Sequence, residues 1–265
     1  MNISLAAEPI FHIGTFPFTN TLAVALGITM ALFSIAWLVR REIADVPRGF
    51  HNAIEAIFEA MLKFMDPITG GRKWSLKFFP VVATIFLFVL FSNLVEVMPG
   101  LGTVGVWGEH EGRRILIPFL RSSSADLNVT LALGLISVLA TQFFGIAALG
   151  VFRYAGKFLV PPWKSPYFIG TFVGVLELIG EVARVISFSF RLFGNIFAGE
   201  VLLTVMLFLV PYVVPLPFLF LEIFVGLVQA VVFSMLTLVF MKIAVTGHEE
   251  HEEHDERAVH ASSAR

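Results

Sequence analysis

The chain has 265 residues, of which 57% are hydrophobic and 14% charged, and its mean hydropathy is +0.85. Soluble domains carry about 25% charged residues, so this composition indicates an integral membrane protein. The lack of cysteine excludes disulfides, iron–sulfur clusters and thiolate metal sites, and the net charge of −2 gives no reason to expect nucleic acid as a partner.

The first apolar run covers residues 19–39, about the 20 residues that a bilayer-spanning helix needs. It ends at Arg40-Arg41. The preceding residues, 1–18, lack the basic stretch that opens a signal peptide. We therefore expect an external N-terminal segment followed by an uncleaved membrane helix.

Residues 47–65 have one apolar and one polar face, which predicts an amphipathic helix. The apolar side chains recur at i, i+3 or i+4 spacing; they are Phe50, Ile54, Ile57, Phe58, Met61, Leu62 and Met65. The polar side chains are Asn52, Glu55, Glu59 and Lys63. We expect this helix to lie at the membrane interface rather than to cross it, although an ordinary packed helix would show the same pattern.

Four further apolar runs predict crossing helices, at residues 78–98, 127–151, 170–210 and 218–245. The run at 170–210 would be about 60 Å long at 1.5 Å per residue, against roughly 30 Å of hydrocarbon. It is therefore either strongly tilted or begins with a separate interfacial segment. Residues 99–124 form a polar loop, and the tail, 247–265, is too polar to pack and is expected to be solvated.

Positive charges set the expected orientation, because cytoplasmic loops carry an excess of lysine and arginine. The connections at 40–77 and 153–164 are strongly basic, whereas the N-terminal segment and the turn at 211–217 have no lysine or arginine. We expect the N-terminus outside and the C-terminal tail in the cytoplasm. The predicted fold is all-α integral membrane: five transmembrane helices plus one interfacial amphipathic helix, in one membrane domain (19–246) whose last two helices form a long tilted hairpin.

An arginine stands inside the longest apolar run. Arg191 belongs to the segment Ser-Phe-Ser-Phe-Arg-Leu-Phe-Gly-Asn-Ile-Phe-Ala-Gly-Glu, residues 187–200, with Asn195 and Glu200 close behind it. A charged side chain near the bilayer centre costs at least about 2.5–3.5 kcal/mol, so it needs a partner or a water path and is by default a functional-site hypothesis. A structural ion pair that holds two helices together is the alternative.

Helical phase, at 100° per residue, sorts the polar residues of the last two helices into faces. One stripe of the long helix holds Glu177, Glu181, Arg184, Phe188, Arg191 and Asn195. Glu200 lies roughly half a turn round from Arg191, on the opposite face. On the last helix Glu222 and Gln229 share a face. Small residues are expected to let neighbouring helices approach closely; these are Gly194, Ala198, Gly199 and Gly226.

The run Arg-Leu-Phe-Gly-Asn at 191–195, followed by Ala-Gly-Glu at 198–200, resembles the signature of subunit a of the F-type (rotary) ATP synthase. The likeness extends to Ser-Ala-Asp-Leu-Asn-Val-Thr at 124–130, to Asn-Leu-Val-Glu at 93–96 and to Gln229, and it covers nearly the whole chain. The order of the helices fits the same family. Position 222, often a histidine in bacterial relatives, is glutamate here.

The resemblance implies a stationary, non-catalytic subunit that needs no cofactor or metal and packs against a ring of c subunits. Two offset half-channels would pass protons to and from the ring carboxylates, with one arginine separating them and coupling proton flow to rotation and ATP synthesis. The implied proton-translocating residues are Arg191, Asn195, Glu200, Glu222 and Gln229. The mouth of the outer half-channel would hold Glu96, Asp126 and Asn128. The inner half-channel would involve Glu177, Glu181, Arg184 and Ser187.

The resemblance also implies three kinds of partner: the b-subunit peripheral stalk, the rest of the ATP synthase complex and the lipid bilayer. The uncleaved N-terminus favours a bacterial inner membrane as that bilayer. A permanent positive charge suits position 191, because arginine does not deprotonate in proteins and so cannot pass on a proton itself. The residues leave open whether the transported ion is H⁺ or Na⁺.

Structural alternatives exist for the acidic residues. Glu200 and Glu222 could be packed polar groups whose hydrogen bonds are satisfied. Glu96 and Asp126 lie where helices are expected to end and begin, and Asp126 could cap a helix.

Near the cytoplasmic surface, Glu181 and Arg184 could simply be paired or solvated. The acidic tail contains histidines that could bind a metal, although a solvated tail is the simpler interpretation; they are His248, His251 and His254.

Two other functions fit an apolar chain of this size. A secondary transporter with a midplane site usually shows two related halves, and this sequence has no internal repeat. A purely structural membrane anchor is the third possibility. Both leave the joint occurrence of Arg191, Glu200 and Gln229 unexplained.

Overall fold

The computed structural model describes residues 9–14, 16–41, 49–98, 105–110, 113–118, 121–151, 154, 169–210 and 213–246. The helices of this part of the chain are α1 (Asn20–Arg41), α2 (Phe50–Thr69), α3 (Arg72–Val97), α4 (Leu127–Leu149), α6 (Ile169–Leu209) and α7 (Pro215–Thr246), with a short 3₁₀ helix, η1 (Ser123–Ala125). Among these described helices, all except α2 and η1 are long and apolar enough to cross a membrane. The expected membrane fold with five spanning helices is therefore confirmed.

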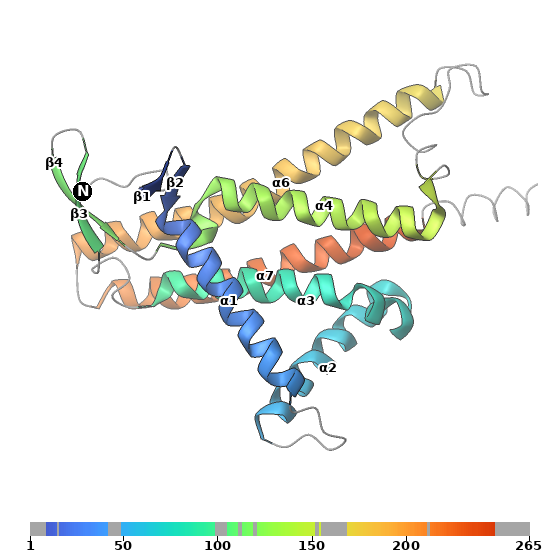
Figure 1. Ribbon diagram of the computed structural model, residues 1–265, viewed down its shortest axis with the longest axis horizontal. Helices are drawn as coiled ribbons and strands as arrows, with labels where there is room; N and C mark the ends of the chain where they lie inside the picture. The colour runs from blue at the N-terminus through green and yellow to red at the C-terminus, as the bar shows by residue number, and fades with distance from the viewer. Residues whose placement is uncertain are drawn as a thin grey trace, which may run out of the picture.

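Two short β-hairpins lie where the sequence suggested only an external segment and a polar loop. They are β1 (Pro9–Ile13) paired with β2 (Phe16–Thr19), and β3 (Gly105–His110) paired with β4 (Arg113–Pro118), both antiparallel. Gly14 follows β1 with φ of 65°, a left-handed conformation that glycine adopts without steric cost. Both hairpins lie at the same end of the molecule (Figure 1), which we call the hairpin end.

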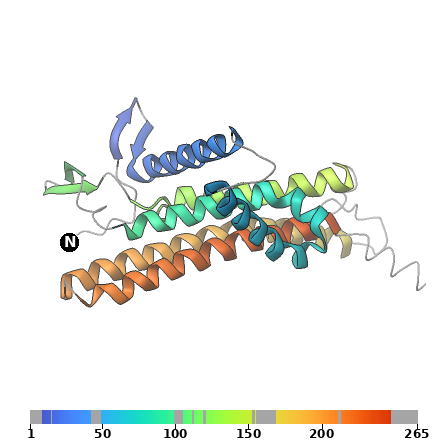
Figure 2. The ribbon, with the colours of Figure 1, turned by 90° about the horizontal axis from the view of Figure 1, so that it is seen from below.

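The helices are stacked in layers, as Figure 2 shows. α6 and α7 run side by side as a hairpin, α3 and α4 lie over them, and α1 forms the outermost layer. The central core consists of buried apolar side chains from α3, α4, α6 and α7; they are Ile85, Val89, Leu133, Phe188, Leu192, Ile196, Ala230 and Phe233. α1 adds little to this core, since only 11% of the residues in its most apolar 18-residue stretch are buried.

α6 is one unbroken helix of 41 residues. Of the two alternatives that its length left open, the structure therefore shows the single long helix and not a separate interfacial segment. At 1.5 Å per residue it is about 60 Å long, twice the usual hydrocarbon thickness. In a bilayer it must be strongly tilted or extend beyond the hydrocarbon.

α2 lies across the bundle rather than along it (Figures 1 and 2). Its inner face is packed: Leu62 and Met65 are buried, and Met65 lies in a cluster with Phe78 of α3 and Leu238 of α7. Ile57, which the sequence pattern assigns to the apolar face, is 52% exposed. The structure thus shows a packed amphipathic helix, and contact of its outer face with the membrane interface stays a prediction.

Side-chain caps fix the start of two helices at the hairpin end. Thr19 Oγ1 accepts a hydrogen bond from the backbone N–H of Leu22 at 3.3 Å, and Asp126 Oδ1 accepts one from the N–H of Asn128 at 2.8 Å. Such caps satisfy N–H groups that the first helical turn leaves unpaired. The hydroxyl of Thr21 also donates to Asp126 Oδ2 at 2.6 Å, which ties α1 to the start of α4.

Candidate functional site

Arg191 lies in the middle of α6, and its side chain is exposed. Its Nη2 donates to the hydroxyl of Ser187, one turn earlier, at 3.4 Å. No carboxylate in the described part of the chain forms an ion pair with it. Gly194 and Ala198 are exposed on the same side of the helix, and no described atom outside α6 lies within 4 Å of the Cβ position of Gly194. The close helix approach expected at Gly194 does not occur within these residues, and the face around Arg191 is open.

One turn beyond Arg191, Asn195 joins α6 to α7. Its Nδ2 donates to Oε1 of Gln229 at 2.9 Å, and Gln229 is buried. The Nε2 of Gln229 is also buried but has no acceptor among the described residues. A buried N–H group costs free energy unless an acceptor satisfies it, so this position favours water or a partner group.

Glu222 of α7 lies against α6 at a place where α6 has no side chain. Glu222 is 6% exposed, and a Cβ at Gly199 would overlap its carboxylate. One turn further along α7, Nδ2 of Asn93 of α3 donates to the carbonyl of Gly226 at 3.0 Å, and a Cβ at Gly226 would lie 3.0 Å from the Cβ of Asn93. The close approach expected at Gly199 and Gly226 is therefore observed.

Glu200 forms an ion pair with Arg121, a residue that the sequence pattern presents only as a loop charge. Nη2 and Nε of Arg121 lie 3.0 and 3.3 Å from Oε2 of Glu200, and the arginine side chain is 8% exposed. Glu96, near the end of α3, lies within electrostatic range of Glu222, Glu200 and Arg121. We call these four residues the hairpin-end cluster. Both oxygens of Glu96 are buried close to the hydroxyl of Ser122, which also donates to the carbonyl of Ser92, and Oε1 of Glu222 is buried without a hydrogen-bond partner in the described chain.

Arg121 is held in place by the serine turn that follows it. The hydroxyl of Ser122 donates to the carbonyl of Ser92 on α3 at 3.0 Å, and that of Ser123 donates to the Ser92 hydroxyl at 2.8 Å. All three serines are buried. Three consecutive serines stand between Arg121 and the capping residue Asp126. This run is the feature of the sequence that could have indicated a packed polar turn rather than a solvated loop.

Asp126 and Asn128 lie at the same end but outside this set of contacts. Both oxygens of Asp126 are occupied, by Thr21 and by the backbone N–H of Asn128. The capping alternative is thus observed for Asp126. The side chain of Asn128 is exposed. Within the described residues neither side chain bonds to the hairpin-end cluster, so their place at a channel mouth stays a prediction.

Glu181 and Arg184 form an ion pair toward the other end of α6. Arg184 Nη1 lies 2.7 Å from Glu181 Oε2, and Glu181 is buried. The guanidinium of Arg184 also lies over the ring of Phe240 on α7, at 3.9 Å from its centroid. Of the alternatives for this pair, the structure shows the paired one.

Tyr154, which the sequence pattern did not single out, is buried beside this pair. Its hydroxyl donates to Gln142 of α4, and its ring occupies the space that the missing side chain of Gly145 leaves. Burial raises the pKa of Tyr154 to about 12, and the negative charges of Glu181 and Glu177 act in the same direction. The phenol is therefore a neutral hydrogen-bond donor. Tyr154, Glu177, Glu181 and Arg184 form what we call the opposite-end cluster.

The interior between the two clusters is mainly apolar, with a few buried hydroxyls such as those of Ser137 and Thr237, which bond to each other. Phe188 and Leu192, next to Arg191 on the inner side of α6, are 3% and 0% exposed, and the ring of Phe188 lies 5.1 Å from that of Phe233 on α7. The predicted stripe places Phe188 with Arg191, yet Phe188 is turned inward. Along α6, Glu181 and Glu200 lie about 15 and 14 Å from Arg191 at 1.5 Å per residue. We call Phe188, Leu192 and Phe233 the apolar layer.

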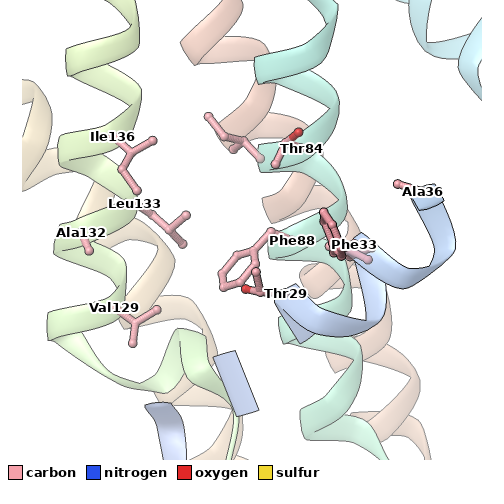
Figure 3. A pocket seen from close by; sticks show the side chains of 11 residues that line it. Thr29, Phe33, Ala36, Thr84, Phe88, Val129, Ala132, Leu133 and Ile136 are labelled. Carbon is pink, nitrogen blue, oxygen red and sulfur yellow. The ribbon is translucent and has the colours of Figure 1, made fainter. Parts of the chain in front are cut away.

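A cavity of about 570 Å³ lies elsewhere, between α1, α3 and α4 (Figure 3). Its lining is apolar apart from two threonines; Figure 3 labels Thr29, Phe33, Ala36, Thr84, Phe88, Val129, Ala132, Leu133 and Ile136. The hydroxyls of Thr29 and Thr84 donate to carbonyls of their own helices, at 2.8 and 2.7 Å. The lining offers no titratable group, so the cavity suits an apolar chain or helix rather than an ion.

No group of three or more histidine, aspartate or glutamate side chains is placed to hold a metal ion within the described residues. The histidines of the tail, and the tail itself, lie outside those residues.

Five apolar helices, an exposed mid-helix arginine and two buried polar clusters define a polytopic membrane protein whose charges gather around one long helical hairpin. A family model described as ATP synthase A chain matches residues 21–242. The ATP synthase subunit a of Helicobacter pylori is 35% identical over 235 residues, which cover 88% of this chain and 92% of the relative. Those of Campylobacter concisus and Moorella thermoacetica are 33% and 30% identical, over 84% and 90% of this chain and 88% and 96% of their own lengths. The chain belongs to the ATP synthase A chain family, which confirms the resemblance seen in its motifs.

Proposed function

We propose that this chain is the stationary proton-translocating subunit of a rotary ATP synthase. It passes protons through two offset half-channels to and from the carboxylates of a c-subunit ring, and so couples their flow to rotation and ATP synthesis. Membership of the ATP synthase A chain family supports its place as a proton-translocating subunit of that complex. The observation that carries the rest is the exposed position of Arg191, without a carboxylate partner in the described chain, between two polar clusters that an apolar layer separates.

The open face around Arg191 supports docking of a ring. A guanidinium facing lipid near the bilayer centre costs at least about 2.5–3.5 kcal/mol, so Arg191 is stable there only against a partner or water. A ring carboxylate meets this need, because it is stable in lipid only when protonated, whereas beside Arg191 its ionised form is favoured. Exposed Gly194 and Ala198 leave room for a ring helix.

Arg191 also acts as a barrier in this proposal. Arginine stays protonated, so it blocks protons from passing directly between the two half-channels. The apolar layer supports the same separation inside the bundle, since it offers a proton neither water nor an acceptor. A proton that enters on one side then crosses only by travelling on the ring.

The hairpin-end cluster is the proposed outer half-channel. The unpartnered buried atoms of Glu222 and Gln229 support a hydrated path, because buried polar groups without a protein partner are commonly satisfied by water. In this proposal a proton passes Glu200 and Asn195, which lie on α6 between the hairpin end and Arg191. Asp126 and Asn128 stand near the mouth in this proposal.

The opposite-end cluster is the proposed inner half-channel. It contains the predicted inner residues Glu177, Glu181 and Arg184, and Ser187 lies between them and Arg191 on α6. Tyr154 adds a hydroxyl to this region.

The layers of the molecule suggest where the partners sit. The ring would contact the α6 and α7 layer, whereas the apolar cavity between α1, α3 and α4 would receive a membrane helix of the b-subunit stalk on the other side of the bundle (Figure 2). The basic residues near α2 would face the cytoplasm of a bacterium, with the N-terminus outside and the tail inside.

The chain has no nucleotide site of its own in this proposal. Its sequence contains no Gly-x-x-x-x-Gly-Lys-Ser/Thr loop, the motif whose backbone N–H groups hold nucleotide phosphates in many ATPases. ATP would be made by other subunits of the complex.

Arg191→Ala tests the proposal in the complete complex, reconstituted into vesicles. ATP-driven proton pumping, measured with a pH-sensitive dye, should be abolished while the subunits still co-purify. Arg40→Ala, which removes an exposed arginine at the end of α1, is the matched control and should pump normally. Full coupled pumping by Arg191→Ala would overturn the proposal.

A further inference from the structure

The hairpin-end cluster holds three acids and one base from four parts of the chain: Glu96 of α3, Glu200 of α6, Glu222 of α7 and Arg121 ahead of η1. The nearby Asp126 has both oxygens occupied. Three ionised carboxylates around one guanidinium, away from bulk water, would carry a large cost in desolvation and repulsion. The cluster is stable only if its acids have different roles.

Hydrogen bonds separate these roles. Oε2 of Glu200 accepts from both Nη2 and Nε of Arg121, at 3.0 and 3.3 Å. Glu96 meets no charged donor among the described residues but only the neutral hydroxyl of Ser122, which also donates to the carbonyl of Ser92, and Oε1 of Glu222 is buried without a donor. Charge-assisted bonds hold a carboxylate ionised and in one position, whereas a carboxylate without a charged donor can exchange a proton with water or a neighbour.

We propose that Arg121 is a positioning residue of the outer half-channel: it holds Glu200 as a fixed counter-charge, so that Glu96 and Glu222 are the side chains that take up and pass on protons. This inference rests on the proposed function. The serine turn supports it, because a residue that positions another must itself be held, and Ser122 and Ser123 bind the turn to α3. Glu200 then belongs to the site without carrying the transported proton.

Charge-removing variants of the whole reconstituted complex test the pair. Arg121→Gln leaves Glu200 without its counter-charge, and pumping should fall at least about tenfold, since breaking a buried pair leaves an uncompensated charge. The double variant Arg121→Gln/Glu200→Gln removes both charges and keeps two amides that can hydrogen-bond. It should pump at least about fivefold faster than Arg121→Gln alone, because coupled residues deviate from additivity in this way.

Glu96→Gln and Glu222→Gln are the matched controls, because each removes one proposed proton carrier with little change of shape. Each substitution should abolish pumping, and the additional substitution Arg121→Gln should not restore pumping in either variant. Arg121→Lys keeps the charge but not the forked geometry, so it should pump at a rate between wild type and Arg121→Gln.

The pH profile separates positioning from a purely structural role. Without Arg121, the acid at position 200 has no fixed counter-charge, so the pH dependence of pumping by Arg121→Gln should differ in shape from that of the wild type, whereas a purely structural defect would lower the rate equally at every pH. The double variant has no acid at position 200 and should follow the wild-type profile.

Two results would overturn the inference. If the double variant Arg121→Gln/Glu200→Gln is as inactive as Glu222→Gln, then Glu200 itself carries protons. If Arg121→Gln pumps like wild type, the ion pair has no role in transport. Should Arg121→Gln fail to assemble, the rate of the double variant alone still distinguishes a fixed counter-charge from a proton carrier at position 200. Failure of the proposed function is a different outcome, since it would appear as pumping that survives Arg191→Ala.

Discussion

Gly199 makes room for the carboxylate of Glu222 by having no side chain. The carboxylate of Glu222 lies against α6 at this glycine, and any Cβ there would overlap it. The overlapping atoms belong to the flexible end of Glu222, so a larger residue at 199 displaces the carboxylate and leaves the two helices in place.

Gly199→Ala is therefore expected to slow ATP-driven pumping by about tenfold to a hundredfold, because a displacement of about 1 Å in a reacting group can have that effect. The second substitution Glu222→Asp shortens the acid by one methylene and should restore part of the rate. Dye-detected pumping in vesicles measures both. A Gly199→Ala complex that pumps at the wild-type rate would place the carboxylate of Glu222 off the proton path.

At the residue scale, the sequence pointed to Arg191 because a charge inside an apolar run is conspicuous. It also placed Gln229 on the same helix face as Glu222, and the structure shows that both are buried. It could not reveal the role of Arg121, whose partner Glu200 is 79 positions away, because nothing beside Arg121 in the chain indicates the ion pair. Tyr154 was missed for the same reason.

At the scale of single elements, Asp126 links the start of α4 to α1. Asp126→Ala is expected to lower the free energy of unfolding by about 1–2 kcal/mol, since it removes an N-cap. Asp126→Asn should keep most of that stability, because asparagine caps helices as well as aspartate does. Denaturant unfolding of the purified protein in detergent would measure the difference.

The same two variants separate a cap from a channel mouth. If Asp126→Asn is stable but pumps poorly, the carboxylate itself is needed for proton entry. Equal stability of Asp126→Ala and wild type would contradict the capping role.

The spanning helices could be predicted because the bilayer imposes a length and an apolar composition on them. α4, expected at 127–151, is Leu127–Leu149, and α6, expected at 170–210, is Ile169–Leu209. α3 begins at Arg72 rather than at residue 78, because lysines and arginines are tolerated in its exposed first turns although hydropathy rejects them. The hairpins were missed because short strands in a polar segment give no comparable signal.

In the proposed function the whole molecule offers partners two different surfaces, one around exposed Arg191 on α6 and one at the cavity beside α1. Gly194→Trp should fill the space that a ring helix needs. Coupled pumping should fall at least about tenfold, since close helix packing in membranes depends on small residues. The isolated chain should be unaffected, because no described atom outside α6 lies within 4 Å of that Cβ position.

Ala147→Trp, at an exposed position on α4, is the matched control. Co-purification with the ring and pumping in vesicles measure the effect. Normal ring binding by Gly194→Trp would place the ring on another face.

Hydropathy predicted how many helices cross the membrane but not how they are layered. The order of the layers depends on contacts between positions that are distant in the sequence. In one such contact, the hydroxyl of Ser189 on α6 donates to the carbonyl of Thr130 on α4 at 3.0 Å. A Cβ at Gly134 would lie 2.6 Å from that hydroxyl oxygen, so this helix pair packs closely only because position 134 is glycine. No periodicity along one helix contains that information.

The buried phenylalanines and Leu192 between the two clusters bear on how such a complex is assembled in a living cell. If the chain works as proposed, a copy that reaches the membrane before its rotor would offer ions two dead ends. Newly made protein would then accumulate without short-circuiting the energised membrane, and conduction would start only once a rotor is in place to carry charge from one dead end to the other.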